Sequence, residues 1–374
     1  MIKVGLVGIG NCASSLVQGI AYCRAKDGNA IGLPFPTLGN YTPSDIEIVC
    51  AFDVDSRKVG KNLSEAIFSP PNCTSVFWPT VSNGTQVSRG PVLDGVSALM
   101  RNQSADRGFT TAVGPEPKQA DIISILRKAE VDVVVNFLPV GSQLASEFYA
   151  ECALQAGCAF VNGIPVFLAS NSHWSSRFAS AGLPILGDDI KAQLGATIFH
   201  RALARLFDMR GGKLDRSYQL NIGGNTDFLN MTDHDRLLSK RESKTASVQS
   251  NIREPLDTEN IRVGPSDYVP WLNDQKIGYI RLEGRLFGGV PMSVEVRLSV
   301  EDSPNSAAMA LIAIRCAKIA RDRRIGGAVA EASAFLFKHP PRQVGDEEAL
   351  LMLERFAAGK IRVIERERFA GVGA

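Results

Sequence analysis

The sequence has few of the features that mark membrane, secreted or nucleic-acid-binding proteins. No apolar run reaches the roughly 18 residues of a membrane-spanning helix. The first residues enter a strand pattern and show no signal-peptide pattern. The formal net charge is only +2, so no overall field favours nucleic acid or an anionic membrane. We therefore expect a cytoplasmic protein that binds neither nucleic acid nor membrane.

Cysteine and histidine are also sparse. The seven cysteines form no CxxC motif, a pattern typical of buried thiols in a reducing compartment. The four histidines form no HxxxH pair, so we expect no zinc ligands. The sequence also lacks the GxSxG motif of serine hydrolases. If the protein is an enzyme, other residue types must carry its acid–base chemistry.

The clearest motif that is present opens the chain. An apolar stretch over residues 2–7 runs into Gly8-x-Gly10-x-x-Ala13, and apolar residues at helical spacing follow. This order of strand, glycine turn and helix is the dinucleotide-binding fingerprint, in which the free N–H groups of the helix face the phosphates. A tight structural turn without a ligand is the alternative. The predicted cofactor-binding residues of this motif are Gly8, Gly10, Asn11, Cys12 and Ala13.

A second predicted strand, residues 46–52, ends at Asp53. An acid at this position binds the ribose hydroxyls of NAD, although it usually lies ~20 residues after the glycines. In this chain the distance along the sequence from Gly8 to Asp53 is longer, and we attribute the additional residues to an insertion loop over residues 24–44. The acid favours NAD over NADP, a preference that Arg57 and Lys58 weaken. The alternative role for Asp53 is a helix N-cap.

The next part of the chain alternates helices with apolar strands, which indicates a doubly wound parallel sheet. Residues 70–117 have poor periodicity, as in a functional loop or an ordered excursion. Pro139 directly follows a strand, at the sheet edge where such folds bind ligands. The predicted helices span residues 119–130, 142–156, 170–181 and 193–207, and the predicted strands span residues 131–137, 159–162 and 184–186.

The pattern then changes to one of longer strands. We expect a second, mostly antiparallel sheet built from residues 218–222, 277–282 and 291–300, with a polar segment over residues 225–265. Helices are predicted again over residues 306–321 and 346–357. We expect these late helices to cover the first sheet.

Lysines are the candidates for acid–base chemistry, because a lysine cluster suits an anionic substrate such as a sugar phosphate and stabilises oxyanions. The alternative for each lysine is a solvated surface position. The acidic pairs Asp188-Asp189 and Glu301-Asp302 follow strands and could orient a lysine, bind a cation or cap a helix. The candidate lysines are Lys191, Lys240, Lys244, Lys276 and Lys338. These residues alone do not identify the reaction.

Almost the whole chain resembles the myo-inositol-1-phosphate synthase family in its compact actinobacterial form. The strings that carry the resemblance are Val7-Gly8-Ile9-Gly10-Asn11-Cys12-Ala13-Ser14-Ser15-Leu16, Ala51-Phe52-Asp53-Val54-Asp55, Lys58-Val59-Gly60, Arg89-Gly90-Pro91, Leu93-Asp94-Gly95, Leu138-Pro139-Val140-Gly141-Ser142, Gly187-Asp188-Asp189-Ile190-Lys191, Gly223-Gly224-Asn225-Thr226-Asp227-Phe228-Leu229-Asn230-Met231, Gly264-Pro265-Ser266-Asp267 and Asp302-Ser303-Pro304-Asn305-Ser306.

The resemblance implies an NAD-dependent isomerisation of D-glucose 6-phosphate to 1D-myo-inositol 3-phosphate, a step of inositol and phospholipid biosynthesis. It proceeds by oxidation at C5, enolisation, closure of the ring from C6 to C1, and reduction. The resemblance also implies a homotetramer and three parts of the chain: an NAD-binding Rossmann domain (1–200), an inserted α+β domain (201–310) and a C-terminal return to the first domain (311–374). It leaves open whether a divalent or monovalent cation is needed.

The same resemblance assigns roles to individual residues. Lys240 transfers a proton at O5, and Lys244 contacts the phosphate or O1. Lys276 is a further active-site lysine, and Lys338 stabilises developing oxyanions. The resemblance also places Asp189 and Asp302 as acids that orient the lysines, and Asn225 as a catalytic residue near the nicotinamide and the substrate. It places Asp188 among the cofactor-binding residues.

One position departs from the family pattern. The family usually has a serine that contacts the substrate phosphate after Asp189-Ile190-Lys191, and this chain has Ala192. We expect weaker substrate binding as a result. Two other functions stay open at this stage: an NAD-dependent sugar-phosphate dehydrogenase, which would accumulate NADH, and a non-catalytic NAD-binding sensor.

Overall fold

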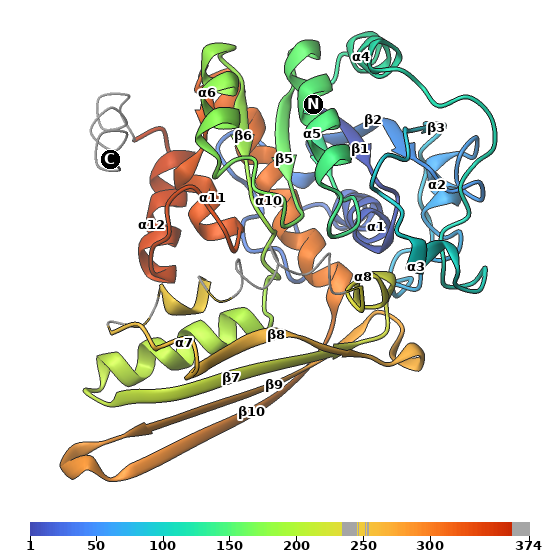
Figure 1. Ribbon diagram of the computed structural model, residues 1–374. Helices are drawn as coiled ribbons and strands as arrows, with labels where there is room; N and C mark the ends of the chain where they lie inside the picture. Colours follow the sequence, from blue (N-terminus) through green and yellow to red (C-terminus); the bar gives the residue numbers. More distant parts are fainter. Residues whose placement is uncertain (234–244, 246, 251, 253, 361–374) are drawn as a thin grey trace.

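The computed structural model describes residues 1–233, 245, 247–250, 252 and 254–360. Its larger sheet has seven parallel strands in the order β11-β6-β5-β4-β1-β2-β3 (Figure 1). The strands are β1 (Ile2–Val7), β2 (Ile46–Asp53), β3 (Val87–Arg89), β4 (Val133–Asn136), β5 (Ala159–Asn162), β6 (Pro184–Leu186) and β11 (Gly327–Ala328). The predicted doubly wound parallel sheet is confirmed.

Helices cover both faces of this sheet, which explains why its central strands are apolar on both sides. Side chains of β4 are buried at every position. One hydrophobic cluster joins the sheet to α1 and α10, and a second joins it to α4, α5 and α6. Among the described residues, the chain forms the helices α1 (Asn11–Lys26), α2 (Leu63–Ala66), α3 (Ala98–Arg101), α4 (Gln119–Lys128), α5 (Gln143–Ala156), α6 (Ser172–Ser180), α7 (Ala196–Met209), α8 (Thr226–Asn230), α10 (Asp302–Asp322), α11 (Ala330–Leu336) and α12 (Asp346–Ala357).

A second sheet extends across one end of the molecule, and α7 packs against its inner face (Figure 1). Its strands follow the order β10-β9-β7-β8. Both pairings of β9 are antiparallel, whereas β7 and β8 run parallel. The prediction of a mostly antiparallel sheet is therefore confirmed. The strands are β7 (Lys213–Gly223), β8 (Ile261–Tyr268), β9 (Gln275–Arg285) and β10 (Pro291–Glu301).

The sequence patterns did not predict α2, β3, α3, α8, β8, β11 or α11, which are mostly short. Strand β8 begins inside the segment expected to be polar and irregular, because its Gly264 and Pro265 are poor strand formers. Strand β11 has two residues and α11 has seven, too few to establish a period. Within the described residues, no helix is both long and apolar enough to cross a membrane.

Helix α10 leads the chain from the second sheet back to the first. It begins directly after β10 and packs against α1 in the larger cluster. The chain then adds β11 beside β6 at the edge of the parallel sheet. This path brings the start of α10 close to the start of α1, where the candidate site lies.

Candidate functional site

The glycine turn after β1 requires its first glycine. Gly8 has a φ of +84°, and a Cβ built there would lie 2.7 Å from the carbonyl oxygen of Phe137. Gly10 has an ordinary extended backbone and caps α1. A Cβ on Gly10 would meet no described protein atom within 4 Å. The turn therefore leaves open space above Gly10, where the fingerprint places a pyrophosphate.

The start of α1 suits an anionic ligand. Among the described residues, no side chain caps this helix, and its first turn contains no acid. The Asn11 side-chain oxygen accepts hydrogen bonds from the backbone N–H groups of Cys73 and Thr74. Burial raises the pKa of the Cys12 thiol to about 12, so this thiol is neutral. The positive end of the helix dipole thus faces the open space without a competing protein anion in the first turn.

Asp53 fixes the turn to the end of β2. One carboxylate oxygen accepts the N–H of Ile9 at 2.7 Å, and the other accepts the N–H groups of Val54 and Asp55. The buried Lys58 amine donates to the Ile9 carbonyl at 2.8 Å. Both backbone groups of Ile9 are therefore held. This arrangement presents the Asp53 carboxylate at the wall of the cleft.

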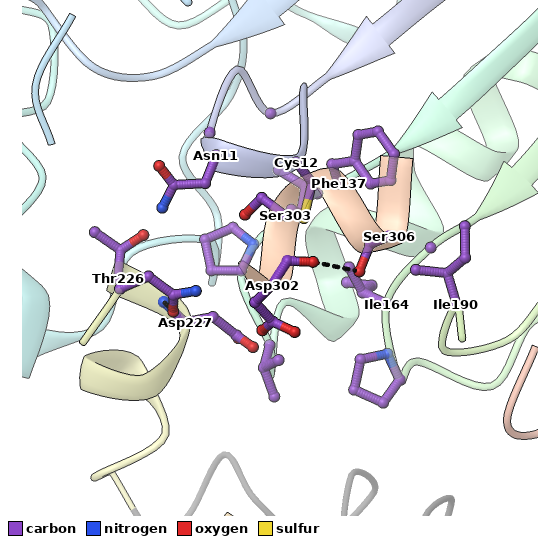
Figure 2. Close-up of a pocket in the computed structure, with 18 of the residues that line it drawn as sticks. Asn11, Cys12, Phe137, Ile164, Ile190, Thr226, Asp227, Asp302, Ser303 and Ser306 are labelled. Atoms are coloured by element: carbon purple, nitrogen blue, oxygen red, sulfur yellow. Dashed lines mark hydrogen bonds between the residues drawn. The ribbon is translucent and has the colours of Figure 1, made fainter. Parts of the chain in front are cut away.

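The cleft leaves about 1700 Å³ free of protein atoms, part of it open to solvent. Its walls come from the carboxyl ends of the parallel strands, from β9 and from the starts of α7, α8 and α10. Figure 2 shows the parts of the wall at the starts of α1, α8 and α10. The predicted site residues that line it are Gly8, Gly10, Asn11, Cys12, Asp53, Pro139, Asp189, Asn225, Lys276, Asp302 and Lys338.

Two lysine–aspartate pairs lie at the wall of this cleft. The Lys276 amine is 2.9 Å from a carboxylate oxygen of Asp302, and the Lys338 amine is 2.8 Å from one of Asp189. Lys276 lies on β9, Asp302 begins α10, and Lys338 follows α11. The fold therefore brings together lysines that are far apart in the sequence, each beside a predicted orienting acid.

Asp188 and Ala13 lie outside the cleft wall. The buried Asp188 carboxylate accepts hydrogen bonds from the Asn162 amide, from the backbone of Leu168 and Ala169 and from Ser170. It holds the loop after β5 rather than facing the cleft. Ala13 is fully buried in the larger cluster, where its small side chain lets α1 approach the sheet. Lys240 and Lys244 lie outside the described residues.

Lys191 is also buried away from the cleft wall. Its amine donates to the Ala334 carbonyl at 2.8 Å and lies 3.7 Å from Asp346. Burial, followed by the nearby Arg201, lowers the pKa of Lys191, and Asp346 opposes both effects; the net result is a pKa of about 7. The structure thus gives this candidate lysine a place in the protein interior.

The sequence reading missed several groups of cleft residues. Apolar residues of the segment 70–117, which was expected to be a functional loop or an ordered excursion, form one wall of the cleft. The starts of α7 and α10 add polar backbone and hydroxyl groups to another part of the wall. Because residues 70–117 have poor periodicity, the sequence did not show which of their side chains face the cleft. The apolar residues beside prolines and glycines were the signal that could have indicated a wall. The missed lining residues include Val54, Val92, Val96, Phe109, Gly195, Ala196, Thr197, Ser303 and Ser306.

The residues present fit a dinucleotide better than a metal ion. The open space above Gly10, the uncapped start of α1 and the Asp53 carboxylate form the three contact points of the fingerprint. In the part of the chain that the structure describes, no group of three or more histidine, cysteine, aspartate or glutamate side chains is placed to hold a metal.

This fold and this cleft define a Rossmann-type nucleotide-binding class. The family model for myo-inositol-1-phosphate synthase matches residues 195–303. The inositol-3-phosphate synthase of Mycolicibacterium smegmatis is 50% identical, over 96% of this chain and 98% of that protein. The corresponding synthase of Corynebacterium glutamicum is also 50% identical, over 95% and 98% of the two chains.

A solved structure agrees in fold. A myo-inositol-1-phosphate synthase-related protein from Thermotoga maritima aligns with a TM-score of 0.79 at 24% identity, over 96% of this chain and 98% of that one. Because the two curated relatives match nearly end to end at half identity, the chain belongs to the myo-inositol-1-phosphate synthase family. The resemblance inferred from the sequence is confirmed.

Proposed function

We propose that the protein is an inositol-3-phosphate synthase that uses NAD to isomerise D-glucose 6-phosphate to 1D-myo-inositol 3-phosphate. The observation that carries this proposal is one cleft with the glycine turn and two lysine–aspartate pairs in its walls. The curated relatives named for this activity support it.

Gly8, Gly10, the start of α1 and Asp53 would hold the dinucleotide, with the apolar wall around Val92 and Phe109 beside them. NAD, when bound, would accept a hydride from C5 of the sugar and return it after ring closure. The Arg57 guanidinium forms an ion pair with Asp55 and donates hydrogen bonds to backbone carbonyls. The Lys58 amine donates to Ile9 and Asn72. Neither cation is therefore free for a 2′-phosphate, which supports NAD over NADP.

The paired lysines stabilise the negative charge that develops on the oxygens of the sugar. Enolisation at C6 and attack on the C1 aldehyde place negative charge on oxygen, and ammonium groups held in a cleft stabilise such charge. Asp189 fixes the Lys338 amine at the wall, and Asp302 fixes that of Lys276. We assign Lys338 to the developing oxyanions and keep Lys240 for proton transfer at O5 and Lys244 for the phosphate or O1. Asn225 and Lys276 both line the cleft.

The start of α7 is the proposed seat of the substrate phosphate. Gly195, Ala196, Thr197 and Ile198 line the cleft there. In this described helix, no side chain caps the N-terminus and no acid lies in the first turn. The positive helix end attracts a dianionic phosphate. Ala192 lies at the same wall, where the family has a serine.

The Ala192→Ser variant tests this seat. We expect the KM for glucose 6-phosphate to fall about fivefold to tenfold with kcat little changed, because one hydroxyl donor to a charged group contributes roughly 1.5–3 kcal/mol at most. Steady-state kinetics measure it, with Ala181→Ser on the exposed surface after α6 as the matched control. An unchanged or higher KM would place the phosphate elsewhere.

The assembly and location of the protein are part of the proposal. The β9–β10 hairpin exposes an apolar tip, with Phe287 fully exposed and Leu286 and Val290 about half exposed. Exposed apolar clusters mark association surfaces. We assign this end of the second sheet to contacts between copies in a homotetramer located in the cytoplasm.

One experiment separates the proposal from its two rivals. Purified protein is incubated with glucose 6-phosphate and NAD, while phosphorus NMR follows the product and near-ultraviolet absorbance follows NADH. Inositol phosphate without lasting NADH supports the synthase. Steady accumulation of NADH would indicate a sugar-phosphate dehydrogenase, and bound NAD with unchanged sugar phosphate would indicate a sensor.

A further inference from the structure

A buried carboxylate behind the cleft wall touches three of the elements that carry predicted catalytic residues. Asp274 directly precedes β9 and is 1% exposed. It does not line the cleft. Lys276 follows it by two residues, near the start of β9, so the position of Asp274 bears directly on that of the lysine.

The Asp274 carboxylate binds the starts of two helices. One oxygen accepts the Asn225 amide at 2.9 Å and the Ser303 hydroxyl at 2.8 Å, and the other accepts the Ser303 N–H at 3.1 Å. Its backbone carbonyl also accepts the N–H of Asp302 at 3.0 Å. The start of α8, the start of α10 and the start of β9 therefore meet at one side chain.

Asn225 depends on this contact for its orientation. Its side-chain oxygen accepts the N–H groups of Asp227 and Phe228 and so caps α8. Its amide nitrogen must then point to Asp274. Gly224 lets the chain before β9 come this close, because a Cβ there would lie 2.5 Å from the Asn273 nitrogen.

The surroundings of Asp274 favour an ionised acid. The Asn225 amide and the Ser303 N–H can only donate, and the Ser303 hydroxyl also donates to Asp274, so an ionised carboxylate satisfies all three partners. Burial, followed by the nearby Asp302 carboxylate, raises the pKa of Asp274 to about 6. The other titratable groups near it are Cys12 from α1 and Cys73 from the loop before β3.

We propose that Asp274 is a positioning residue that sets Asn225 and the Asp302–Lys276 pair at the cleft wall. The assignment rests on the proposed synthase function for its kinetic consequence. Because Asp274 lies behind the wall, it acts through these three side chains and not on the sugar itself. Figure 2 shows the part of the wall concerned, with Asp302 and Ser303 at the start of α10 and Thr226 and Asp227 at the start of α8.

The Asp274→Asn variant keeps the shape of the side chain but turns an NH₂ group toward a donor. We expect kcat to fall about 10²-fold, as for a misplacement of catalytic groups by about 1 Å, while the Kd for NAD stays within threefold. Ser303→Ala removes one donor and should lower kcat in the same direction by a smaller factor. Wild-type kcat within threefold in Asp274→Asn would overturn the inference.

Asp132→Asn is the matched control. This carboxylate accepts the Lys3 N–H and the Arg321 guanidinium at the amino end of β4, on the far edge of the sheet from the cleft. The Asp132→Asn substitution should lower the unfolding temperature and leave kcat unchanged. An equal kcat loss in Asp132→Asn and Asp274→Asn would mean that Asp274 matters only for general stability.

A thermal double-variant cycle tests the contact without using turnover. If Asp274 holds Asn225, the unfolding temperature of the Asp274→Asn, Asn225→Ala double variant should fall by less than the sum of the single losses. Strictly additive losses would overturn the positioning role. Because this readout needs no substrate, failure of the inference is distinguishable from a wild-type protein that fails to convert glucose 6-phosphate.

Discussion

Replacing Lys338 with alanine should reduce formation of inositol phosphate by about 10²–10³-fold, the usual cost of losing one oxyanion donor. Hydride transfer to bound NAD should stay within about tenfold, because this lysine is assigned to ring closure. The Lys338 amine has a defined place at the cleft wall, 2.8 Å from Asp189. A single-turnover experiment measures both steps, with absorbance for NADH and rapid quench for the product.

Two further variants keep this result interpretable. Lys338→Ala leaves the nearly buried Asp189 carboxylate without this ion pair, so Lys338→Ala with Asp189→Asn removes the charge imbalance. Lys128→Ala, in the last turn of α4, controls for the loss of an exposed lysine. Equal slowing of hydride transfer and ring closure would refute the division of roles among the lysines.

Gly8→Ala should lower the stability of the fold, whereas Gly10→Ala should leave the stability unchanged and weaken cofactor binding. Alanine at Gly8 must adopt a φ of +84° and overlap the Phe137 carbonyl, which we expect to cost about 3 kcal/mol or more in unfolding free energy. Alanine at Gly10 has an ordinary backbone and meets no described protein atom within 4 Å. Its stability should stay within about 0.5 kcal/mol of wild type.

The affinity for NAD should fall in the Gly10→Ala variant. A methyl group on Gly10 occupies the space assigned to the pyrophosphate, so the Kd for NAD should rise at least about tenfold in a protein that is still folded. Calorimetric titration gives the Kd, and thermal unfolding gives the stability. Wild-type affinity in Gly10→Ala would mean that the dinucleotide does not pass over this residue.

The sequence predicted those parts of the site that lie where a strand ends. The glycine turn, Asp53 and Pro139 all follow strands of the parallel sheet, so the fold class alone brings them to one edge. The lysine–aspartate pairs needed more than a pattern. Lys338 and Asp189 are paired because α11 returns the chain to the sheet, and that short helix gives no readable period.

The sequence did not show which of several nearby candidate side chains face the cleft. Asp188 and Asp189 were both predicted at the site, yet only Asp189 lines the cleft, because successive side chains leave the backbone in different directions. Lys191 turns inward in the same way. Asp274 could not be found from spacing, because its importance depends on the meeting of three elements that are distant along the chain.

The most direct test of the central claim follows the carbon–carbon bond that a synthase must make. Glucose 6-phosphate labelled with carbon-13 at both C1 and C6 is incubated with the protein and NAD. These two carbons are not bonded in the substrate, and ring closure joins them. Ring closure should therefore give new one-bond coupling between the two labelled carbons in the product, with no lasting NADH. Labelled carbons that remain uncoupled, with or without NADH, would contradict the proposed synthase function.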